Sequence, residues 1–453
     1  MTAVQGRLTA APDAPERGIA ELLAWLWRLG PVRDEPAPGT VAIAGPEAAA
    51  ELRAAVRAGG LAGAVILAPG ARPEAPGLPA RTVASGAARF RGVGRVSGEH
   101  TLLGGGTAAV SSSLGTHAVR EDRVLVAGAS PQRWGDLTQW WLLPALADFL
   151  PSVLGRPLVA LPPVGCLRLD DAPGTAELQL LGHAKPDGRE RARIRAMLDA
   201  VERSGSRLVI AVVARALRDE AIVPIEEVWP QSIALLAEGV ERGVLEPACH
   251  GLLHLDPAEH AAGRVAAREF LRLDREQAGR HLDEALAWMS ERLGPARSFI
   301  APAWGYSDGA LEAAAERGLV TWMPPQAGPL LAGHLLHETL HDGLPGLTRL
   351  DYAPLARIAA AGLPPTVVFH GRLLDGRMER LREARDVASL ARLLRRRDLE
   401  RVAALPGVRW VGAEELAARL RAHGEVDVDG DRVPPGADAI LIDGGPGPPR
   451  TAP

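Results

Sequence analysis

The feature that most constrains the fold is a regular alternation of short apolar runs with amphipathic segments, which begins near residue 164. Seven of the runs have the length and composition of buried strands. They are residues 164–170, 207–214, 244–250, 297–302, 318–323, 365–370 and 408–412. Helical patterns lie between them at residues 188–204, 230–242, 263–293, 309–317 and 380–404. Because strands that alternate with helices form parallel sheets, we predict an α/β fold whose main part, residues 160–421, is a distorted (β/α)7-type barrel.

A smaller α/β domain is predicted to precede the barrel, over residues 18–155. It begins with a strand–helix–strand pattern at residues 40–70, which favours two parallel strands joined by a crossover helix. Residues 1–17 are expected to be a disordered tail, and residues 422–453 a small β element followed by a Gly/Pro tail. No pattern in the smaller domain assigns it a role.

Composition and charge exclude several classes of partner. A net charge of −4 over 453 residues gives no reason to expect a nucleic-acid partner. The most apolar stretch is interrupted by Asp148 and Arg156, and the first residues lack the apolar core of a signal peptide, so we expect neither a membrane span nor secretion. Two cysteines are too few for a disulfide framework. We therefore expect a cytoplasmic protein with no nucleic-acid or membrane partner, and we leave open that it forms a homo-oligomer.

Polar side chains end several of the predicted strands. The first strand ends in Asp170 and Asp171, the third ends in His250 with His254 four residues later, and His370 ends the sixth. In β/α barrels the carboxyl ends of the strands meet on one face and carry the catalytic residues. One carboxylate and two imidazoles are a normal ligand set for zinc or a similar divalent ion, and a second carboxylate is then free to act as a base.

These residues resemble the motifs of the polysaccharide deacetylase superfamily (NodB-homology deacetylases, carbohydrate esterase family four). The family's T-F-D-D-G motif resembles "RLDDAPG" at 168–174, and its H-S/T-x-x-H-P motif resembles "HGLLHLDP" at 250–257. Its R-x-P-Y/W-G motif resembles "APAWG" at 301–305, and its last motif, a strand ending in L-H, resembles "VVFHG" at 367–371. The resemblance covers residues 164–420 and implies a NodB-like barrel.

The resemblance also implies a role for each matching residue. Asp171, His250 and His254 would bind the divalent metal, which is zinc in the first instance, with cobalt, nickel or manganese as alternatives. Asp170 would be the general base that takes a proton from the attacking water, and His370 the general acid that protonates the departing amine. Pro302 and Trp304 would form an apolar wall for a small acyl group.

Two departures from the family pattern concern the surroundings of the metal. The arginine of the third motif, which orients the base in the family, is missing, since Ile300 and Ala301 occupy its neighbourhood. Arg168 lies two residues before Asp170 on the same face of the strand, and we expect it to take over this role. The family's D-x-x-D-W motif is also missing, and Asp351 is its nearest candidate. We therefore expect a substrate other than a long chitin-like polymer.

A second motif gives an alternative. The segment "HETLH" at 337–341 matches the zinc-protease pattern, in which a helix, here residues 329–341, presents His337 and His341 and Glu338 acts as the base. Hydrolysis of another C–N bond, such as a cyclic amide, and a non-catalytic binding protein on a deacetylase scaffold also stay open. The prediction is a metal-dependent hydrolase of non-peptide amide bonds that removes an acetyl group from a sugar or sugar-like small molecule.

Overall fold

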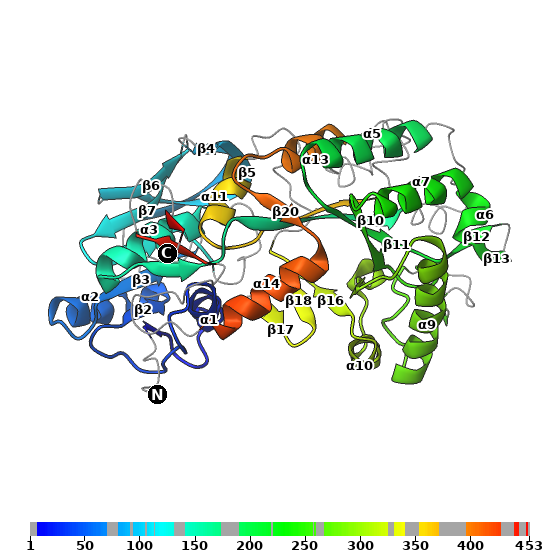
Figure 1. Cartoon of the computed structure of the whole chain (residues 1–453). Coiled ribbons are helices and arrows are strands. Elements are labelled where there is room, and N and C mark those ends of the chain that lie inside the picture. The colour runs from blue at the N-terminus through cyan, green and yellow to red at the C-terminus, as the bar shows by residue number, and fades with distance from the viewer. Residues whose placement is uncertain are drawn as a thin grey trace.

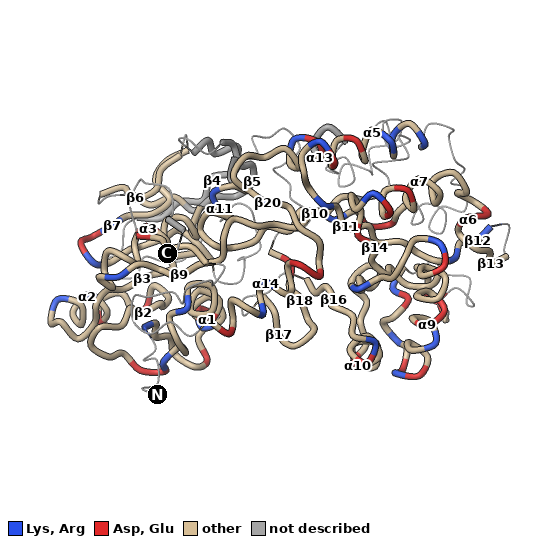
Figure 2. The backbone as a smooth tube through the Cα atoms, viewed as in Figure 1, with Lys and Arg blue, Asp and Glu red and all other residues tan. Residues whose placement is uncertain are grey.

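The computed structural model describes residues 7–69, 80–90, 94–104, 107–112, 114–130, 141–173, 190–218, 221–256, 258–259, 267–324, 330–339, 353–370, 396–426, 439–443 and 450–451. They form two large sheets that lie side by side, the first on the left and the second on the right of Figure 1. Charged residues of both signs lie next to one another along the outer helices in Figure 2; Arg280, for example, pairs with Glu276. Among the described helices, none has the length and apolar character needed to cross a bilayer.

The second sheet contains every strand predicted for the barrel region. These strands are β10 (Val164–Ala172), β11 (Leu208–Val212), β14 (Leu245–Cys249), β15 (Ser298–Phe299), β16 (Val320–Met323), β19 (Thr366–His370) and β20 (Arg409–Val411). They are joined by β17 (Leu331–Ala332) and β18 (Leu335–His337), and the order is β17-β18-β16-β15-β14-β11-β10-β19, with β20 on β10. All pairings except that of β17 with β18 are parallel, which confirms a parallel α/β fold. No pairing joins β17 to β19 among the described residues, so closure into a barrel stays a prediction.

Strands β17 and β18 replace the helix that we expected over residues 329–341. Gly333 adopts a φ of +62° and starts a tight turn, which a helix cannot contain. After the turn, Leu335–His337 pair in parallel with Thr321–Met323 of β16. The backbone groups of this segment are therefore satisfied by the sheet, and the helix prediction is wrong for the described residues 330–339.

Helices cover the connections between these strands. They are α5 (Glu190–Arg203), α6 (Ile225–Val228), α7 (Pro230–Glu241), α9 (Arg275–Arg292), α10 (Asp308–Glu316), α11 (Ala353–Ala360), α13 (Arg396–Ala403) and α14 (Ala413–Glu425). Helix α9 begins later than predicted because Asp274 caps it: the carboxylate accepts the amide of Gln277, whose side chain accepts the amide of Asp274. A hairpin of β12 (Arg215–Arg218) and β13 (Ala221–Pro224) lies beside α6.

The first sheet combines a parallel part and an antiparallel part. Its parallel strands are β1 (Leu8–Thr9), β2 (Val41–Ala44), β3 (Gly63–Leu67) and β8 (Val124–Ala127). Helix α2 (Ala49–Arg57) connects β2 to β3, as the strand–helix–strand pattern predicted. The antiparallel strands are β4 (Ala80–Phe90), β5 (Gly94–Gly104), β6 (Thr107–Ser112) and β7 (Gly115–Glu121). The predicted disordered tail is wrong for residues 7–17, because Leu8 is buried and β1 extends the sheet at β2.

The two sheets share one hydrophobic core. A single cluster of buried apolar side chains contains residues of both, such as Val65 on β3 and Leu167 on β10. Helix α1 (Arg17–Leu26) lies against α14, and the Trp27 indole donates a hydrogen bond of 2.8 Å to the carbonyl of Ala361. Near α3 (Leu142–Leu154), β21 (Ile440–Ile442) pairs with β9 (Leu158–Ala160) and with β22 (Arg450–Thr451). The extent of each predicted domain stays a prediction.

His423 makes the contact between α14 and α1 sensitive to pH. Its Nε2 lies 2.9 Å from the carbonyl oxygen of Leu26, and burial lowers the pKa of His423 from 6.5 to about 4. As pH falls below 6.5, the unfolded chain takes up a proton at this site that the folded chain does not yet bind, so folding loses stability. Between pH 7.5 and pH 5 this loss amounts to about 2 kcal/mol.

Glutamine does not titrate in this range. We therefore expect the free energy of unfolding to fall less between pH 7.5 and pH 5 in His423→Gln than in the wild type. Denaturant unfolding of both proteins at pH 7.5 and pH 5 measures the two losses. Equal losses in the two proteins would contradict the assignment to His423.

Candidate metal centre

The candidate site lies at the carboxyl ends of β10 and β14, which both flank β11. Strand β10 carries a β-bulge there: Leu169 pairs with Ile210 and Ala172 with Val212, so that Asp170 and Asp171 together face the single residue Ala211. In a regular strand, neighbouring side chains point to opposite faces of the sheet. The bulge, with Asp171 at a φ of 57°, explains how two consecutive carboxylates both reach the same end of the sheet.

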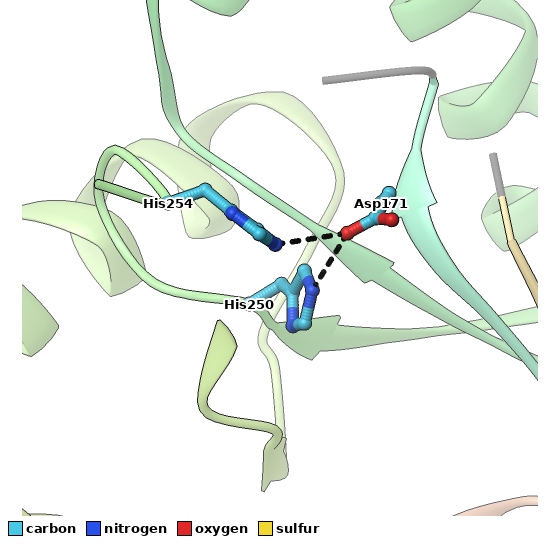
Figure 3. Close-up of side chains that lie close together, drawn as sticks. All are labelled: Asp171, His250 and His254. Atoms are coloured by element: carbon cyan, nitrogen blue, oxygen red, sulfur yellow. Dashed lines mark hydrogen bonds and ion pairs between the residues drawn. The ribbon is translucent and has the colours of Figure 1, made fainter. Parts of the chain in front are cut away.

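Asp171, His250 and His254 converge on one point, as Figure 3 shows. His250 Nε2 and His254 Nε2 lie 3.1 Å and 3.0 Å from the same oxygen, Oδ1 of Asp171. One ligand atom from each residue falls within 4.8 Å of the others, and all three residues are buried. The structure thus brings together the three residues that the sequence predicted as metal ligands.

A backbone carbonyl orients the first histidine. His250 Nδ1 lies 2.9 Å from the carbonyl oxygen of Ile300, which can only accept a hydrogen bond. Nδ1 therefore donates a proton to this carbonyl, and Nε2 is the ring nitrogen that faces Asp171 and could bind a metal ion. Metal-binding histidines are held in the same manner, with the second ring nitrogen donating to a carbonyl or carboxylate.

The charges buried around this point also fit a divalent cation. Asp170, Asp171 and Glu338 are at most 4% exposed, and Arg168, the cation that pairs with two of them, is 0% exposed. Among these four side chains the carboxylates outnumber the guanidinium, so the group carries negative charge that favours a cation. The same field acts on His254: burial alone would lower its pKa, but the Asp171 carboxylate raises it above the ordinary value.

Arg168 and Asp170 form the second part of the site. Arg168 Nε and Nη2 each donate a hydrogen bond of 2.7 Å to Asp170, one to each carboxylate oxygen, and Nη1 pairs with Glu338. The guanidinium carbon also lies 5.3 Å from the ring centre of Trp304 and 5.0 Å from that of Trp322. Burial alone would lower the pKa of Arg168, but the carboxylates of Asp170 and Glu338 raise it above its ordinary value, so the charge persists.

The structure describes the remaining predicted site residues, Pro302, Trp304, His370 and Asp351, to different extents. Pro302 is buried and Trp304 half-buried in a short 3-10 turn after β15, where Ala303 and Trp304 have positive φ values of 49° and 57°. His370 is the last residue of β19, in register with Asp170 of β10. Its side chain and the whole of Asp351 lie outside the described part of the structure.

Backbone strain is concentrated here. Six non-glycine residues of the described chain have a positive φ, and four of them belong to the site, namely Asp171, His254, Ala303 and Trp304. Such conformations cost on the order of 1–3 kcal/mol each and are retained where the surroundings enforce them, often at functional sites.

The zinc-protease interpretation of "HETLH" is wrong for the described residues. His337 ends β18 and its Nδ1 lies 3.2 Å from the carbonyl oxygen of Pro324, while burial lowers its pKa. Glu338 pairs with Arg168 and so belongs to the site at Asp170. His341 lies outside the described residues.

Two buried acids of the site were missed as such from the sequence. Glu338 was predicted only as the base of the zinc-protease alternative, although it follows the short strand-like run Leu335–His337 as Asp170 follows the run that begins at Val164. Glu269 precedes α9 and accepts hydrogen bonds from the loop that carries His254. No signal in the sequence distinguishes Glu269 from the many surface glutamates.

Comparisons with known proteins find similarity to solved structures at low sequence identity. No family model and no curated protein matches the chain. Among solved structures, it is similar to a mutant with restored activity of a carbohydrate esterase family 4 pseudoenzyme from Bacillus anthracis, at 11% identity over 56% of this chain and 68% of that one, with a TM-score of 0.33. It is also similar to the family 4 carbohydrate esterase from Streptomyces lividans in complex with acetate, at 13% identity over 55% and 93% of the two chains, with a TM-score of 0.30. A peptidoglycan deacetylase from Bacillus subtilis gives 14% identity over 57% and 92%, with a TM-score of 0.31.

The metal content of variants distinguishes the motif that contains His250 from the motif that contains His337. We expect the purified protein, loaded with zinc and then desalted, to retain stoichiometric metal, because three buried ligands converge. His250→Ala should lose the metal, since it removes one of three ligands, and His337→Ala should keep it. Elemental analysis by mass spectrometry measures both. Metal that persists in His250→Ala and disappears in His337→Ala would contradict the site.

Proposed function

We propose that the chain is a metal-dependent hydrolase of non-peptide amide bonds, and that it removes an acetyl group from the amine of a sugar or sugar-like small molecule. The observation that carries the proposal is the buried group of Asp171, His250 and His254, whose carboxylate follows in sequence a second buried carboxylate, Asp170, that a buried arginine holds in place. Amide hydrolysis needs an electrophile for the carbonyl and a base for the water, and this arrangement supplies a place for both.

Asp171, His250 and His254 are the residues that would hold the ion, with zinc as the first expectation and cobalt, nickel or manganese as alternatives. When bound, such an ion polarises the amide carbonyl and lowers the pKa of a water at the same place. The bulge at Asp170–Asp171 lets the proposed ligand and the proposed base, which are consecutive in sequence, both lie at the carboxyl end of β10.

Asp170 is proposed as the general base. Both of its oxygens accept hydrogen bonds from Arg168, which fixes the plane of the carboxylate, and each oxygen keeps a further lone pair for the proton of the attacking water. Arg168 would thereby be the positioning residue that replaces the missing arginine of the third motif. Glu338 balances the remaining donor of Arg168 and prevents the guanidinium from turning away from Asp170.

His370 is proposed as the general acid. Its position in register with Asp170 places it on the neighbouring strand at the same carboxyl end. In the proposed reaction the water oxygen bonds to the acyl carbon, the C–N bond breaks, and the amine nitrogen takes a proton from His370. Trp304, half-buried beside Arg168, would form the apolar wall for the small acyl group.

The proposal is tested by incubating the metal-loaded protein with a panel of N-acetylated amino sugars and measuring the acetate released. We expect turnover that a chelator removes and added zinc restores. A protein that binds the metal tightly and releases no acetate from any member of the panel would contradict the substrate class.

Asp170→Asn separates catalysis from metal binding. The variant keeps the shape of the side chain and leaves the three metal ligands intact, so the metal content should not change. Because the amide cannot accept the proton of the water, kcat should fall by about 10²- to 10⁴-fold. Steady-state acetate release, with metal content measured on the same sample, tests this. An unchanged kcat would remove Asp170 from the mechanism.

The contributions of Arg168, Asp170 and Glu338 to stability should depend strongly on one another. Arg168→Met leaves Asp170 and Glu338 buried without their cation, and we expect a loss of about 3–5 kcal/mol in the free energy of unfolding. Arg168→Met/Glu338→Gln removes an opposite charge as well and should recover part of that stability, but not the turnover, since Asp170 stays unanchored. Denaturant unfolding and acetate release measure the two effects. Full activity of Arg168→Met would contradict its positioning role.

A further inference from the structure

One buried carboxylate outside the ligand set supports the loop that carries His254. Glu269 is 1% exposed and lies in the segment that leads into α9. Its Oε2 accepts the amides of His254 and Leu253 at 2.8 Å and 3.0 Å, and its Oε1 accepts the amide of Leu252 at 3.1 Å. Three consecutive amides thus converge on a single carboxylate.

The loop needs such support because its backbone is strained. His254 has a φ of 60°, a region that non-glycine residues rarely adopt, and Gly251 has a φ of +89°. Charge-assisted hydrogen bonds from three amides to one carboxylate are about twice as strong as neutral ones, and they can offset this strain. Without the carboxylate, the loop would relax toward ordinary backbone angles, and His254 Nε2 would move away from Asp171.

Gly251 of the loop packs closely against the Glu269 carboxylate and leaves no room for a side chain at position 251. A Cβ added to Gly251 would lie 2.5 Å from Glu269 Oε2 and 3.0 Å from the ring of Phe270. Glycine at this position therefore allows the carboxylate to approach the amides. Any side chain there would push Glu269 out of its place.

A helix fixes the carboxylate from the other side. His281, on the second turn of α9, places Nδ1 2.7 Å from Glu269 Oε1. The position of His254 is therefore tied through Glu269 and His281 to α9, an 18-residue helix with a capping box at its start. The connection is continuous from the helix to the candidate ligand.

We propose that Glu269, held by His281, is a positioning residue that sets the place of His254 in the metal centre. This inference rests on the metal site of the proposed function. Glu269 does not touch the ligand point itself; it acts through the loop backbone. The structure thus assigns the preorganisation of one ligand to a residue 15 positions further along the chain.

The test is the binding of Co²⁺ and of Zn²⁺, each alone, to the full chain, measured by competition with a chromogenic chelator and by the visible spectrum of the bound Co²⁺. Glu269→Gln removes the charge and replaces one acceptor by a donor. We expect a loss of about 10- to 100-fold in affinity, together with a changed Co²⁺ spectrum. Glu284→Gln is the matched control, because it is the same substitution on α9 at a half-exposed residue that pairs with Arg215, and it should change neither quantity.

Gly251→Ala provides a second, charge-neutral variant in case Glu269→Gln does not fold. Its methyl group displaces the same carboxylate, and alanine also strains the loop backbone at a φ of +89°, so we expect the same direction of change in affinity and spectrum. Wild-type affinity and spectrum in either folded variant, with the metal lost in His254→Ala, would overturn this inference alone. A wild type that binds neither metal would overturn it together with the proposed metal site.

Discussion

The structure depends first on the burial of one charge, the guanidinium of Arg168. A cation at 0% exposure is tolerated only if its donors are paired and its faces are covered. Asp170 of the same strand and Glu338 after β18 supply the acceptors, and Trp304 and Trp322 cover the faces. These partners come from two strands, β10 and β16, and from the segments that follow β15 and β18. The carboxyl edge of that sheet therefore has one arrangement that satisfies the arginine, and the proposed base is part of it.

The candidate metal centre near it is built on strained backbone that neighbouring groups hold in place. The bulge in β10 turns Asp171 toward the histidines, the carbonyl of Ile300 sets the ring of His250, and Glu269 holds the loop of His254. Each ligand thus has a different support, from a strand irregularity, a backbone acceptor and a buried carboxylate. Supports of this kind keep three ligands in position before any ion arrives, which reduces the cost of ordering them on binding.

Much of the second half could be predicted from the sequence, because strands buried on both faces are continuous apolar runs and because the polar residues at their ends are conspicuous. Asp171, His250 and His254 were predicted together for this reason, and the contact of Arg168 with Asp170 followed from their spacing on one strand. Other features could not be predicted. Strands β17 and β18 are too short to show a period, and their identity comes from pairing with β16. The contact of Arg168 with Glu338 joins residues far apart in the chain, so only the fold reveals it.

The pairing of β9 with β21 has a consequence for the order in which the molecule can form. Leu158–Ala160, between the two large sheets, pair with Ile440–Ile442, which follow every strand of the second sheet along the chain. During synthesis on the ribosome, β9 therefore lacks this pairing until the whole second sheet has been translated. Closing a loop of this length is slow, because the chain loses conformational entropy before the pairing of the two strands stabilises the structure. The pairing of β9 with β21 is therefore a late step of vectorial folding, and a nascent chain exposes this edge of β9 until then.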